Sequence, residues 1–197
     1  VQLRELRYLS TGLFDLQSRP IFHVWRLMNS NEELLLTTPR FRVVKVREPG
    51  RPEKAVVRHP GAVVILPLVS DNEVCLIRNY RLSVAQTLIE LPAGTLEPGE
   101  PPLETARREL QEETGYACRS LRQLHRFYLS PGILDEAMHL FVAEGLEPGR
   151  TALEAGETIE NWVVPWDEAM RLVDQGVIQD AKSIVGLLTW DRLRSRK

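Results

Sequence analysis

One stretch of 23 residues, Gly94–Tyr116, constrains this chain more than any other part of it. Pro101 and Pro102 suit the first turn of a helix, where a missing N–H group costs nothing. Gly115 suits the left-handed residue that follows the end of a helix. The stretch therefore predicts a helix that begins at the two prolines and ends before Gly115.

The predicted helix has an apolar face and a group of carboxylates beside it. At about 100° per residue, four residues form one mostly apolar stripe that should pack on a core: Leu103, Ala106, Leu110 and Thr114. Glu109, Glu112 and Glu113 lie at i, i+3 and i+4 along the margin of that stripe. Clustered carboxylates repel one another, and a hard divalent cation would relieve that repulsion. Arg108 stands four residues before Glu112 and can orient its carboxylate.

The glycines, acids and Arg108 of this stretch are spaced in a way that resembles the Nudix box. Gly94, five residues, Glu100, seven residues, Arg108-Glu109-Leu110, one residue, Glu112-Glu113, one residue and Gly115 match that pattern. Only Tyr116 departs from it, since an aliphatic residue is commoner there. The three glutamates alone would fit a solvated acidic helix face, but the glycines and Glu100 stand in register with them.

The resemblance implies an α/β protein with the Nudix fold, in which a mixed sheet lies between helices as an α/β/α sandwich. The alternation of predicted strands and helices supports such a layered arrangement independently. The resemblance also implies Mg²⁺ as the cofactor, with Mn²⁺ as an alternative. Its ligands would be Glu109, Glu112 and Glu113 together with a backbone carbonyl that matches Ala93, and Glu112 is expected to be essential for catalysis.

Composition excludes several other classes of protein. The net charge of −2 gives no basic field that would favour nucleic acid or an anionic membrane, and no apolar run reaches the length of a membrane span. Two cysteines, Cys75 and Cys118, are too few for a disulfide framework. The first residues carry charges and lack the apolar core of a signal peptide. We therefore expect a cytoplasmic protein.

Along the chain, we expect an N-terminal arm with strands over residues 1–58 and a Nudix hydrolase domain over residues 59–197. Residues 23–28 and 34–46 are predicted to be two strands joined by a polar turn, and 54–69 two strands broken at His59-Pro60-Gly61. Strands are also predicted over 73–81, 121–130, 137–146 and 160–165, and helices over 166–175 and 180–194. An arm of this kind needs a surface to bury, so a homodimer is expected.

Three segments outside the box resemble the ADP-ribose pyrophosphatase branch of the Nudix hydrolases. They are ELPAG at residues 90–94, Ser130-Pro131-Gly132, and GVIQDAKSIVGLL at residues 176–188. Asn79 departs from this branch, which usually has Gln there. The resemblance runs from roughly Trp25 to Trp190 and leaves residues 1–20 uncovered.

Five residues are the candidate contacts to substrate: Arg81, Glu90, Pro131, Gly132 and Glu136. The planar guanidinium of Arg81 suits bidentate contact with a diphosphate, although a surface ion pair is the alternative. Glu90 is a lone acid in an apolar segment and is costly to bury without a purpose. Pro131 and Gly132 would shape a loop over the terminal ribose. Glu136 is expected near that ribose, and an exposed loop acid is an equally good interpretation.

Hydrolysis of a diphosphate also needs a group that activates or positions water. In the resembling enzymes this is a glutamate in the loop before the penultimate strand. Here that loop carries Glu154 and Glu157, and the sequence does not distinguish between them.

Three functions are compatible with these residues. The first is Mg²⁺-dependent hydrolysis of ADP-ribose to AMP and ribose 5-phosphate. The second is hydrolysis of GDP-mannose or another nucleoside diphosphate sugar on the same frame. The third is a non-catalytic nucleotide-sensing module, which typically loses carboxylates of the box, whereas this chain keeps all of them.

Overall fold

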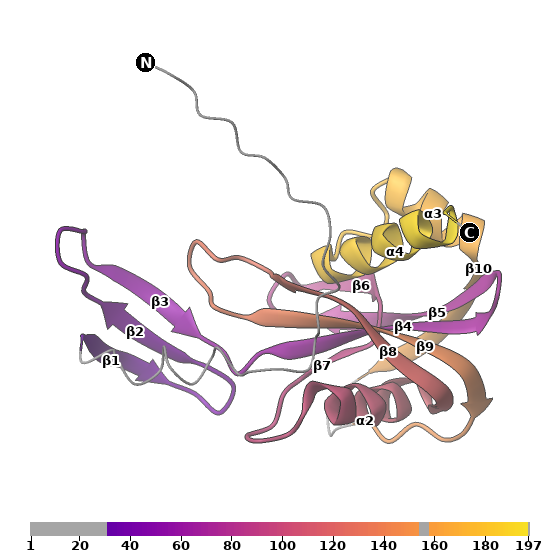
Figure 1. Cartoon of the computed structure of the whole chain (residues 1–197), viewed down its shortest axis with the longest axis horizontal. Coiled ribbons are helices and arrows are strands. Elements are labelled where there is room, and N and C mark those ends of the chain that lie inside the picture. The colour runs from indigo at the N-terminus through magenta and orange to yellow at the C-terminus, as the bar shows by residue number, and fades with distance from the viewer. Residues whose placement is uncertain (1–30, 154–157, 197) are drawn as a thin grey trace, which may run out of the picture.

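The computed structural model describes residues 31–153 and 158–196 (Figure 1). The expectations for residues 1–20 and for a strand at 23–28 fall outside this range. The strands are β1 Glu32–Thr37, β2 Arg42–Val46, β3 Lys54–Arg58, β4 Ala62–Ser70, β5 Glu73–Arg81, β6 Gln86–Glu90, β7 Ala93–Thr95, β8 Tyr116–Tyr128, β9 Ala137–Pro148 and β10 Ile159–Pro165. The helices are α2 Pro102–Thr114, α3 Trp166–Asp174 and α4 Ala181–Arg194.

The main sheet has seven strands and is mixed, as predicted. Its central path runs β10-β5-β4-β9-β8, while β6 pairs with β5 and β7 pairs with β4. Strands β4 and β9 are parallel, and the other pairs are antiparallel. Because β4 joins β5, β7 and β9, the short strand β7 brings the start of the Nudix-box segment into the centre of the sheet.

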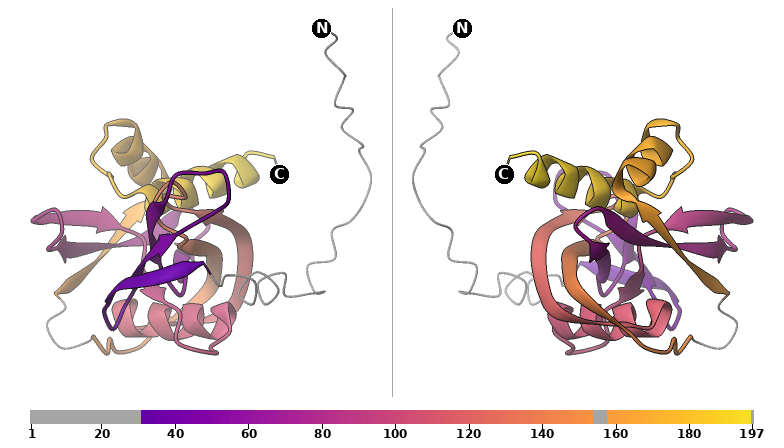
Figure 2. Two further views of the ribbon diagram at one scale, coloured as in Figure 1. Left: turned by 90° about the vertical axis from the view of Figure 1, so that its left-hand side faces the viewer. Right: turned by 90° about the vertical axis from the view of Figure 1, so that its right-hand side faces the viewer.

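Helices cover both faces of the main sheet, which confirms the predicted α/β/α layers. Alternate residues of β4 point to opposite faces. Val63 and Ile65 pack with Ala106 and Leu110 of α2. Ala62, Val64, Leu66 and Leu68 of β4 pack in a second core with residues of α3 and α4, among them Ala169, Leu187 and Trp190. Figures 1 and 2 show α2 on one side of the sheet, with α3 and α4 on the other. Burial on both faces explains why β4 reads as a continuous apolar run.

Strands β1, β2 and β3 form a separate antiparallel sheet at one end of the molecule (Figure 1). The prediction of one strand over residues 34–46 was wrong, since this segment is a hairpin of β1 and β2. Thr38 makes the turn: its N–H donates to the carbonyl of Phe41, and its hydroxyl accepts from the N–H of Phe41, at 2.9 Å each. Side-chain capping of this kind overrides the strand preference of the flanking residues.

Helix α2 begins at Pro102 and ends at Thr114, as predicted, and Gly115 adopts the left-handed conformation at φ 75°. Ala106, Leu110 and Thr114 are buried, but Leu103 is 39% exposed. In the first turn Thr105 is buried instead, and its hydroxyl donates to Oε2 of Glu100 at 2.8 Å. The buried face thus starts later than the apolar spacing predicts, because the first turn packs through this polar contact. Within the described range, no helix combines the length and apolar character needed to cross a membrane.

Candidate active site

The second half of α2 places three glutamates along one edge of the helix, where they lie at different depths. Glu113 is buried, with 5% exposure. The side chain of Glu109 is 13% exposed and that of Glu112 is 35% exposed. The edge therefore runs from the protein interior to solvent, as a site that admits a substrate from outside requires.

Arg108 ties three carboxylates together beside this edge. Its Nη1 donates to Glu109 and to Glu112 at 2.8 Å each. Its Nε and Nη2 donate to the two oxygens of Glu100 at 3.2 and 3.1 Å. The hydrogen bond from Arg108 holds the pKa of Glu100 below its ordinary value, and the bond to Glu100 is the main cause that raises the pKa of Arg108. The predicted contact with Glu112 is confirmed, and Glu100 serves as the anchor of the arginine.

The start of β7 meets the same edge of α2. The N–H of Ala93 donates to Oε2 of Glu113 at 2.8 Å. A Cβ atom on Gly94 would stand only 1.9 Å from the carboxyl carbon of Glu109. Gly94 is therefore required so that the Glu109 carboxylate can lie directly against the backbone. The segment predicted to supply a carbonyl ligand and the helix predicted to supply carboxylates are thus in contact.

Replacing Gly94 with alanine should lower activity without unfolding the protein. The three atoms nearest to the new Cβ all belong to the carboxylate of Glu109, the flexible end of a side chain, which the methyl group would displace. We expect kcat to fall by about ten- to a hundredfold, the range seen when groups that orient metal ligands are altered. Steady-state kinetics at saturating Mg²⁺ and thermal unfolding measure both effects. A large fall in the unfolding temperature with kcat unchanged would contradict this assignment.

The chemistry of the donor set fits a hard divalent cation, because carboxylate oxygens on one helical edge are the ligands that such cations prefer. In the structure, these carboxylates accept hydrogen bonds from groups of the protein. Arg108 bonds to Glu109 and Glu112, while the N–H of Ala93 bonds to Glu113. Among the residues that the structure describes, no three Asp, Glu, His or Cys side chains converge closely enough to form a complete ligand set. Divalent metals are used generally by proteins with this box, so the carboxylates that Arg108 now holds are the candidates to bind one.

A second charged cluster lies at the ends of β5 and β6. Glu90 is 1% exposed, and Nε and Nη2 of Arg81 donate to its two oxygens at 2.7 and 2.6 Å. The Nζ atom of Lys182 donates to Oε2 of Glu90 at 2.6 Å. Burial would raise the pKa of Glu90, but Arg81 and Lys182 outweigh it and hold the pKa below its ordinary value. Arg81 forms an ion pair, but its partner is the buried Glu90 of the same predicted site and not a surface acid.

The two charged clusters are electrostatically linked. The hydrogen bond to Glu90 raises the pKa of Arg81, burial opposes that change, and the charges of Glu113 and Asp180 raise it further. The charges of Glu113 on α2 and of Asp180 at the N-cap of α4 therefore both act on Arg81. Its side chain is 37% exposed, so the guanidinium is also open to solvent.

The loop that carries Pro131 and Gly132 is fixed to the N-terminal sheet. The N–H of Val57 donates to the carbonyl of Ile133 at 2.8 Å, and the N–H of Asp135 donates to the carbonyl of Val57 at 3.1 Å. Pro131 and Gly132 themselves are exposed. Strand β3 therefore holds this loop in place and leaves its tip open to solvent.

Glu136 ends this loop and is mostly buried, with 15% of its side chain exposed. Its Oε1 lies 3.6 Å from Nδ1 of His59, which also accepts from the N–H of Gly61 at 3.2 Å. Leu140, four residues after Glu136, pairs with Val64 on β4, and Val64 pairs with Ala93 on its other side. Four residues of strand correspond to roughly 13 Å along the sheet. Glu136 is thus not an exposed loop acid, and it stands well apart from the α2 carboxylates.

Both predicted candidates for the water-activating acid, Glu154 and Glu157, lie outside the described residues. The chain on each side of them contacts the C-terminal end of α2. The N–H of Ala152 donates to the carbonyl of Glu112 at 2.9 Å. The Nδ2 of Asn161 donates to the carbonyl of Thr114 at 2.7 Å. The described ends of this loop are therefore anchored next to Glu112.

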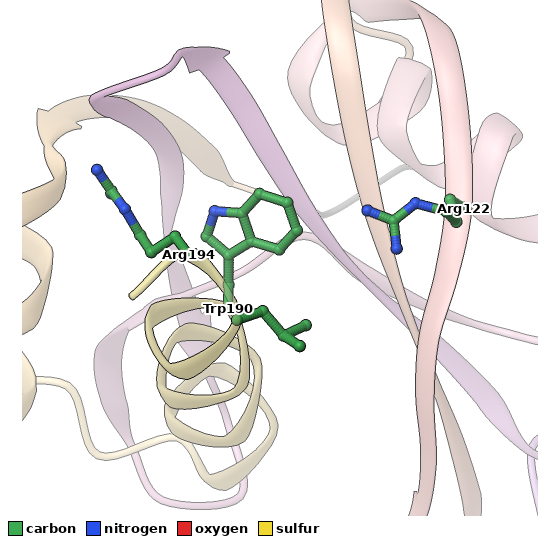
Figure 3. Close-up of a pocket in the computed structure, with 4 residues that line it drawn as sticks. Arg122, Trp190 and Arg194 are labelled. Carbon is green, nitrogen blue, oxygen red and sulfur yellow. The ribbon is translucent and has the colours of Figure 1, made fainter. Parts of the chain in front are cut away.

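A shallow cavity of about 170 Å³ lies elsewhere, lined by Arg122, Trp190, Leu193 and Arg194 (Figure 3). It stands between α4 and β8, whereas α2 covers the opposite face of the sheet. Cavities that enclose a drug-sized ligand have volumes of about 300–1,000 Å³. This cavity is too small for a dinucleotide and does not include any of the predicted site residues.

Sequence reasoning missed Lys182 and His59 as neighbours of predicted site residues. Lys182 is buried beneath Glu90, and His59 faces Glu136. The signal for Lys182 was present in the sequence, because it is the one charged residue in segment 181–188, which is otherwise apolar except for Ser183. A lone charge in such a segment needs a buried partner, which is the criterion that singled out Glu90.

Comparison with known proteins agrees with this geometry. A model of the NUDIX domain matches residues 57–185. The chain is 38% identical over 137 residues to a methanol dehydrogenase activator of Bacillus methanolicus, covering 68% of this chain and 74% of that protein. It is 38% identical over 133 residues to an ADP-ribose pyrophosphatase of Bacillus subtilis, with 66% and 72% covered. A GDP-mannose pyrophosphatase of Cronobacter sakazakii is 36% identical over 152 residues, with 68% and 79% covered.

Among solved structures, an ADP compounds hydrolase superposes with a TM-score of 0.71 over 85% of this chain and 94% of its own. The two sequences are only 24% identical, so this likeness supports the fold alone. The matched domain contains α2 with its carboxylates, the Arg81–Glu90 pair and Lys182. Together with the layered mixed sheet, these matches show that the chain belongs to the Nudix family of hydrolases.

Proposed function

We propose that this protein hydrolyses the diphosphate bond of ADP-ribose in a Mg²⁺-dependent reaction that yields AMP and ribose 5-phosphate. One observation carries the proposal: the carboxylate edge of α2 meets the start of β7 at Ala93, which follows closely in the chain after the Arg81 partner Glu90. This places groups able to hold a cation beside a guanidinium able to hold phosphate. Both groups are needed to bind a diphosphate and to stabilise the charge that develops during its hydrolysis.

The metal would be held by carboxylates of Glu109, Glu112 and Glu113 and by the carbonyl of Ala93. A bound Mg²⁺ supplies Lewis-acid polarisation of the phosphate and lowers the pKa of a coordinated water. The residues of the chain do the positioning. Arg108 keeps the carboxylates aligned through its hydrogen bonds to Glu109 and Glu112.

Arg81 is the proposed phosphate contact. It uses Nε and Nη2 for Glu90, and within residues 31–153 and 158–196 no hydrogen bond uses its Nη1. An oxygen of the diphosphate can accept from that nitrogen, in the charge-assisted geometry that arginine provides. Glu90 fixes the orientation of the guanidinium from the buried side.

The end of the substrate opposite the metal is assigned to the loop that ends at Glu136. This loop is held by β3, and Glu136 precedes the level of Ala93 by roughly 13 Å of strand. An extended nucleoside diphosphate sugar spans such a separation. The carboxylate of Glu136 would accept hydrogen bonds from ribose hydroxyls, while Pro131 and Gly132 shape the loop above them.

The substrate assignment predicts a ranking of catalytic efficiencies. We expect kcat/KM for ADP-ribose to exceed those for GDP-mannose and for a nucleoside triphosphate, because a hexose is bulkier than ribose at the Glu136 loop. The measurement is release of phosphate from the products by an added phosphatase, with each substrate at saturating Mg²⁺. GDP-mannose ahead by tenfold, about 1.4 kcal/mol of transition-state preference, would instead assign the protein to GDP-mannose hydrolysis.

The relatives support two candidate substrates, since one relative is named for ADP-ribose and another for GDP-mannose. A non-catalytic, nucleotide-sensing module is the remaining alternative. It is disfavoured because every charged and glycine position of the box is present and because the carboxylates are assembled around Arg108. Turnover of any nucleotide sugar excludes it.

We also propose that the protein is a homodimer and that residues 1–58 form the arm that makes the interface, with residues 59–197 as the catalytic domain. Apolar side chains of the β1–β3 sheet support this. Leu34, Leu35 and Leu36 are 58%, 47% and 51% exposed, and Phe41 is 37% exposed. Contiguous apolar side chains on an edge strand are typical of a surface that another chain covers.

Light scattering at micromolar concentration should give twice the 22.5 kDa mass of one chain. Replacing Leu36 with glutamate should shift the protein to the monomer, because the new charge would be desolvated at the interface. Val177→Glu is the matched control, since Val177 is 45% exposed and lies between α3 and α4. A monomeric wild-type protein would refute the dimer.

The cytoplasm remains the proposed compartment. Cys75 and Cys118 are both free thiols, and burial raises the pKa of Cys75 to about 11. A buried, protonated thiol of this kind is inert and requires no oxidising environment.

A further inference from the structure

Lys182 is a buried cation that no part of the proposed mechanism uses. Its side chain is 9% exposed, and its Nζ lies 2.6 Å from Oε2 of Glu90 and 3.0 Å from Oδ2 of Asp180. Lysine is almost never buried to this extent unless it is paired. Its two partners are acids, one of which is the buried anchor of Arg81. Because a buried lysine is costly, the role of Lys182 should lie in the carboxylates that it binds.

The start of α4 fixes Lys182 in place from two sides. The side chain of Asp180 caps the helix by accepting from the N–H of Ser183 at 3.0 Å. The hydroxyl of Ser183 accepts from the N–H of Leu91 at 2.7 Å, directly after Glu90. The first turn of α4 is thereby bound to the end of β6, and Lys182 is delivered to Glu90 by a rigid element.

Lys182 changes how the Glu90 carboxylate is held, and Glu90 in turn holds Arg81. Oε2 of Glu90 accepts from both cations, whereas Oε1 accepts from Arg81 alone. With Lys182 present, the negative charge of Glu90 is shared between two cations. Because two donors hold the Glu90 carboxylate, its orientation is fixed, and the orientation of the Arg81 guanidinium that binds it is fixed as well.

We propose that Lys182 is a positioning residue for substrate, acting through Glu90 to present Arg81 to the diphosphate. This inference rests on the proposed role of Arg81 in diphosphate binding. It adds a requirement that the Nudix box does not contain: the first turn of the C-terminal helix must dock on β6 for the phosphate site to be complete.

The test compares Lys182→Met, which keeps the apolar stem and removes the charge, with the wild-type protein. For ADP-ribose at saturating Mg²⁺ we expect KM to rise about tenfold while kcat changes little, because binding common to ground and transition states is lost. Tenfold corresponds to about 1.4 kcal/mol, close to what a hydrogen bond to a charged group contributes. Lys182→Arg should restore most of the affinity. Arg192→Met, at an exposed cation of the same helix, should leave both constants unchanged.

A double-mutant cycle guards against a merely structural effect. In an Arg81→Gln background, which itself should raise KM, adding Lys182→Met should raise KM no further. If Lys182→Met alone does not fold, Glu90→Gln is compared with Glu90→Gln/Lys182→Met, which has no unpaired buried lysine, and the two should share one KM. A further tenfold rise there would overturn the proposal.

The outcomes distinguish the positioning role of Lys182 from the binding of diphosphate by Arg81. If Arg81→Gln raises KM and Lys182→Met does not, Lys182 has no positioning role, while diphosphate binding by Arg81 stands. If neither variant changes KM, the proposed role of Arg81 is itself wrong. A fall in kcat at unchanged KM for Lys182→Met also overturns the positioning role.

Discussion

Replacing Glu112 with glutamine should lower kcat by roughly a hundredfold or more and leave the fold intact. A metal ion contributes several kcal/mol of transition-state stabilisation, and each 1.36 kcal/mol is a factor of ten in rate. Glutamine keeps an oxygen for Arg108 but removes the charge that a divalent cation needs. Because the Glu112 side chain is 35% exposed, losing its ion pair with Arg108 should change stability by about 1 kcal/mol or less.

The measurement is kcat across a titration of Mg²⁺, together with thermal unfolding. Glu104→Gln is the matched control, because Glu104 is an exposed acid in the first turn of the same helix. That variant should behave like the wild-type protein. Near-normal kcat of Glu112→Gln at saturating Mg²⁺ would show that Glu112 is not a metal ligand.

Of the two loop acids, one should prove essential for the chemical step. Glu157→Gln and Glu154→Gln are expected to differ, and one of them should lose kcat by about two to four orders of magnitude, the range typical of general bases. The anchoring of Ala152 and Asn161 at the C-terminal end of α2 supports this, because it ties the described ends of the loop to the neighbourhood of Glu112. KM and the Mg²⁺ requirement of the damaged variant should stay close to wild type.

Pre-steady-state kinetics with substrate in excess over enzyme distinguish a lost base from slow product release in these two variants. A burst of product followed by a slow phase would place the defect after chemistry. If neither substitution slows the reaction, the base lies elsewhere or the metal-bound water needs none.

Elements with strong local signals could be predicted from sequence almost to the residue. Two prolines and a left-handed glycine delimit α2, and Asp71-Asn72 separates β4 from β5, so both boundaries agree with the structure. The apolar runs over β4 and β9 predicted strands, and the structure contains both. Here local propensity, turn chemistry and burial all favour the same structure.

Features that depend on a distant partner could not be predicted in this way. Thr38 turns the chain between β1 and β2 through its side chain, against the strand preference of its neighbours. Leu103 fits the apolar period of α2, yet the first turn packs through Thr105 and Glu100 instead.

The candidate site also combines features that follow from local spacing with features that depend on distant partners. Spacing along one helix placed Glu109, Glu112 and Glu113 on one edge of α2 and gave Arg108 its contact with Glu112. The pairing of Glu90 with Lys182 spans 92 residues, and only the docking of α4 on β6 creates it. Such contacts are tertiary, so their residues appear in the sequence merely as charges in apolar segments.

Phosphorus NMR of the reaction products tests the central claim most directly. With ADP-ribose and Mg²⁺, the two diphosphate resonances should disappear, and two phosphomonoester resonances, those of AMP and ribose 5-phosphate, should replace them. A chelator should abolish the change, and Glu112→Gln should slow it strongly. If ADP-ribose, GDP-mannose and a panel of other nucleoside diphosphate sugars all keep their diphosphate resonances with Mg²⁺ present, the protein is not the hydrolase proposed here.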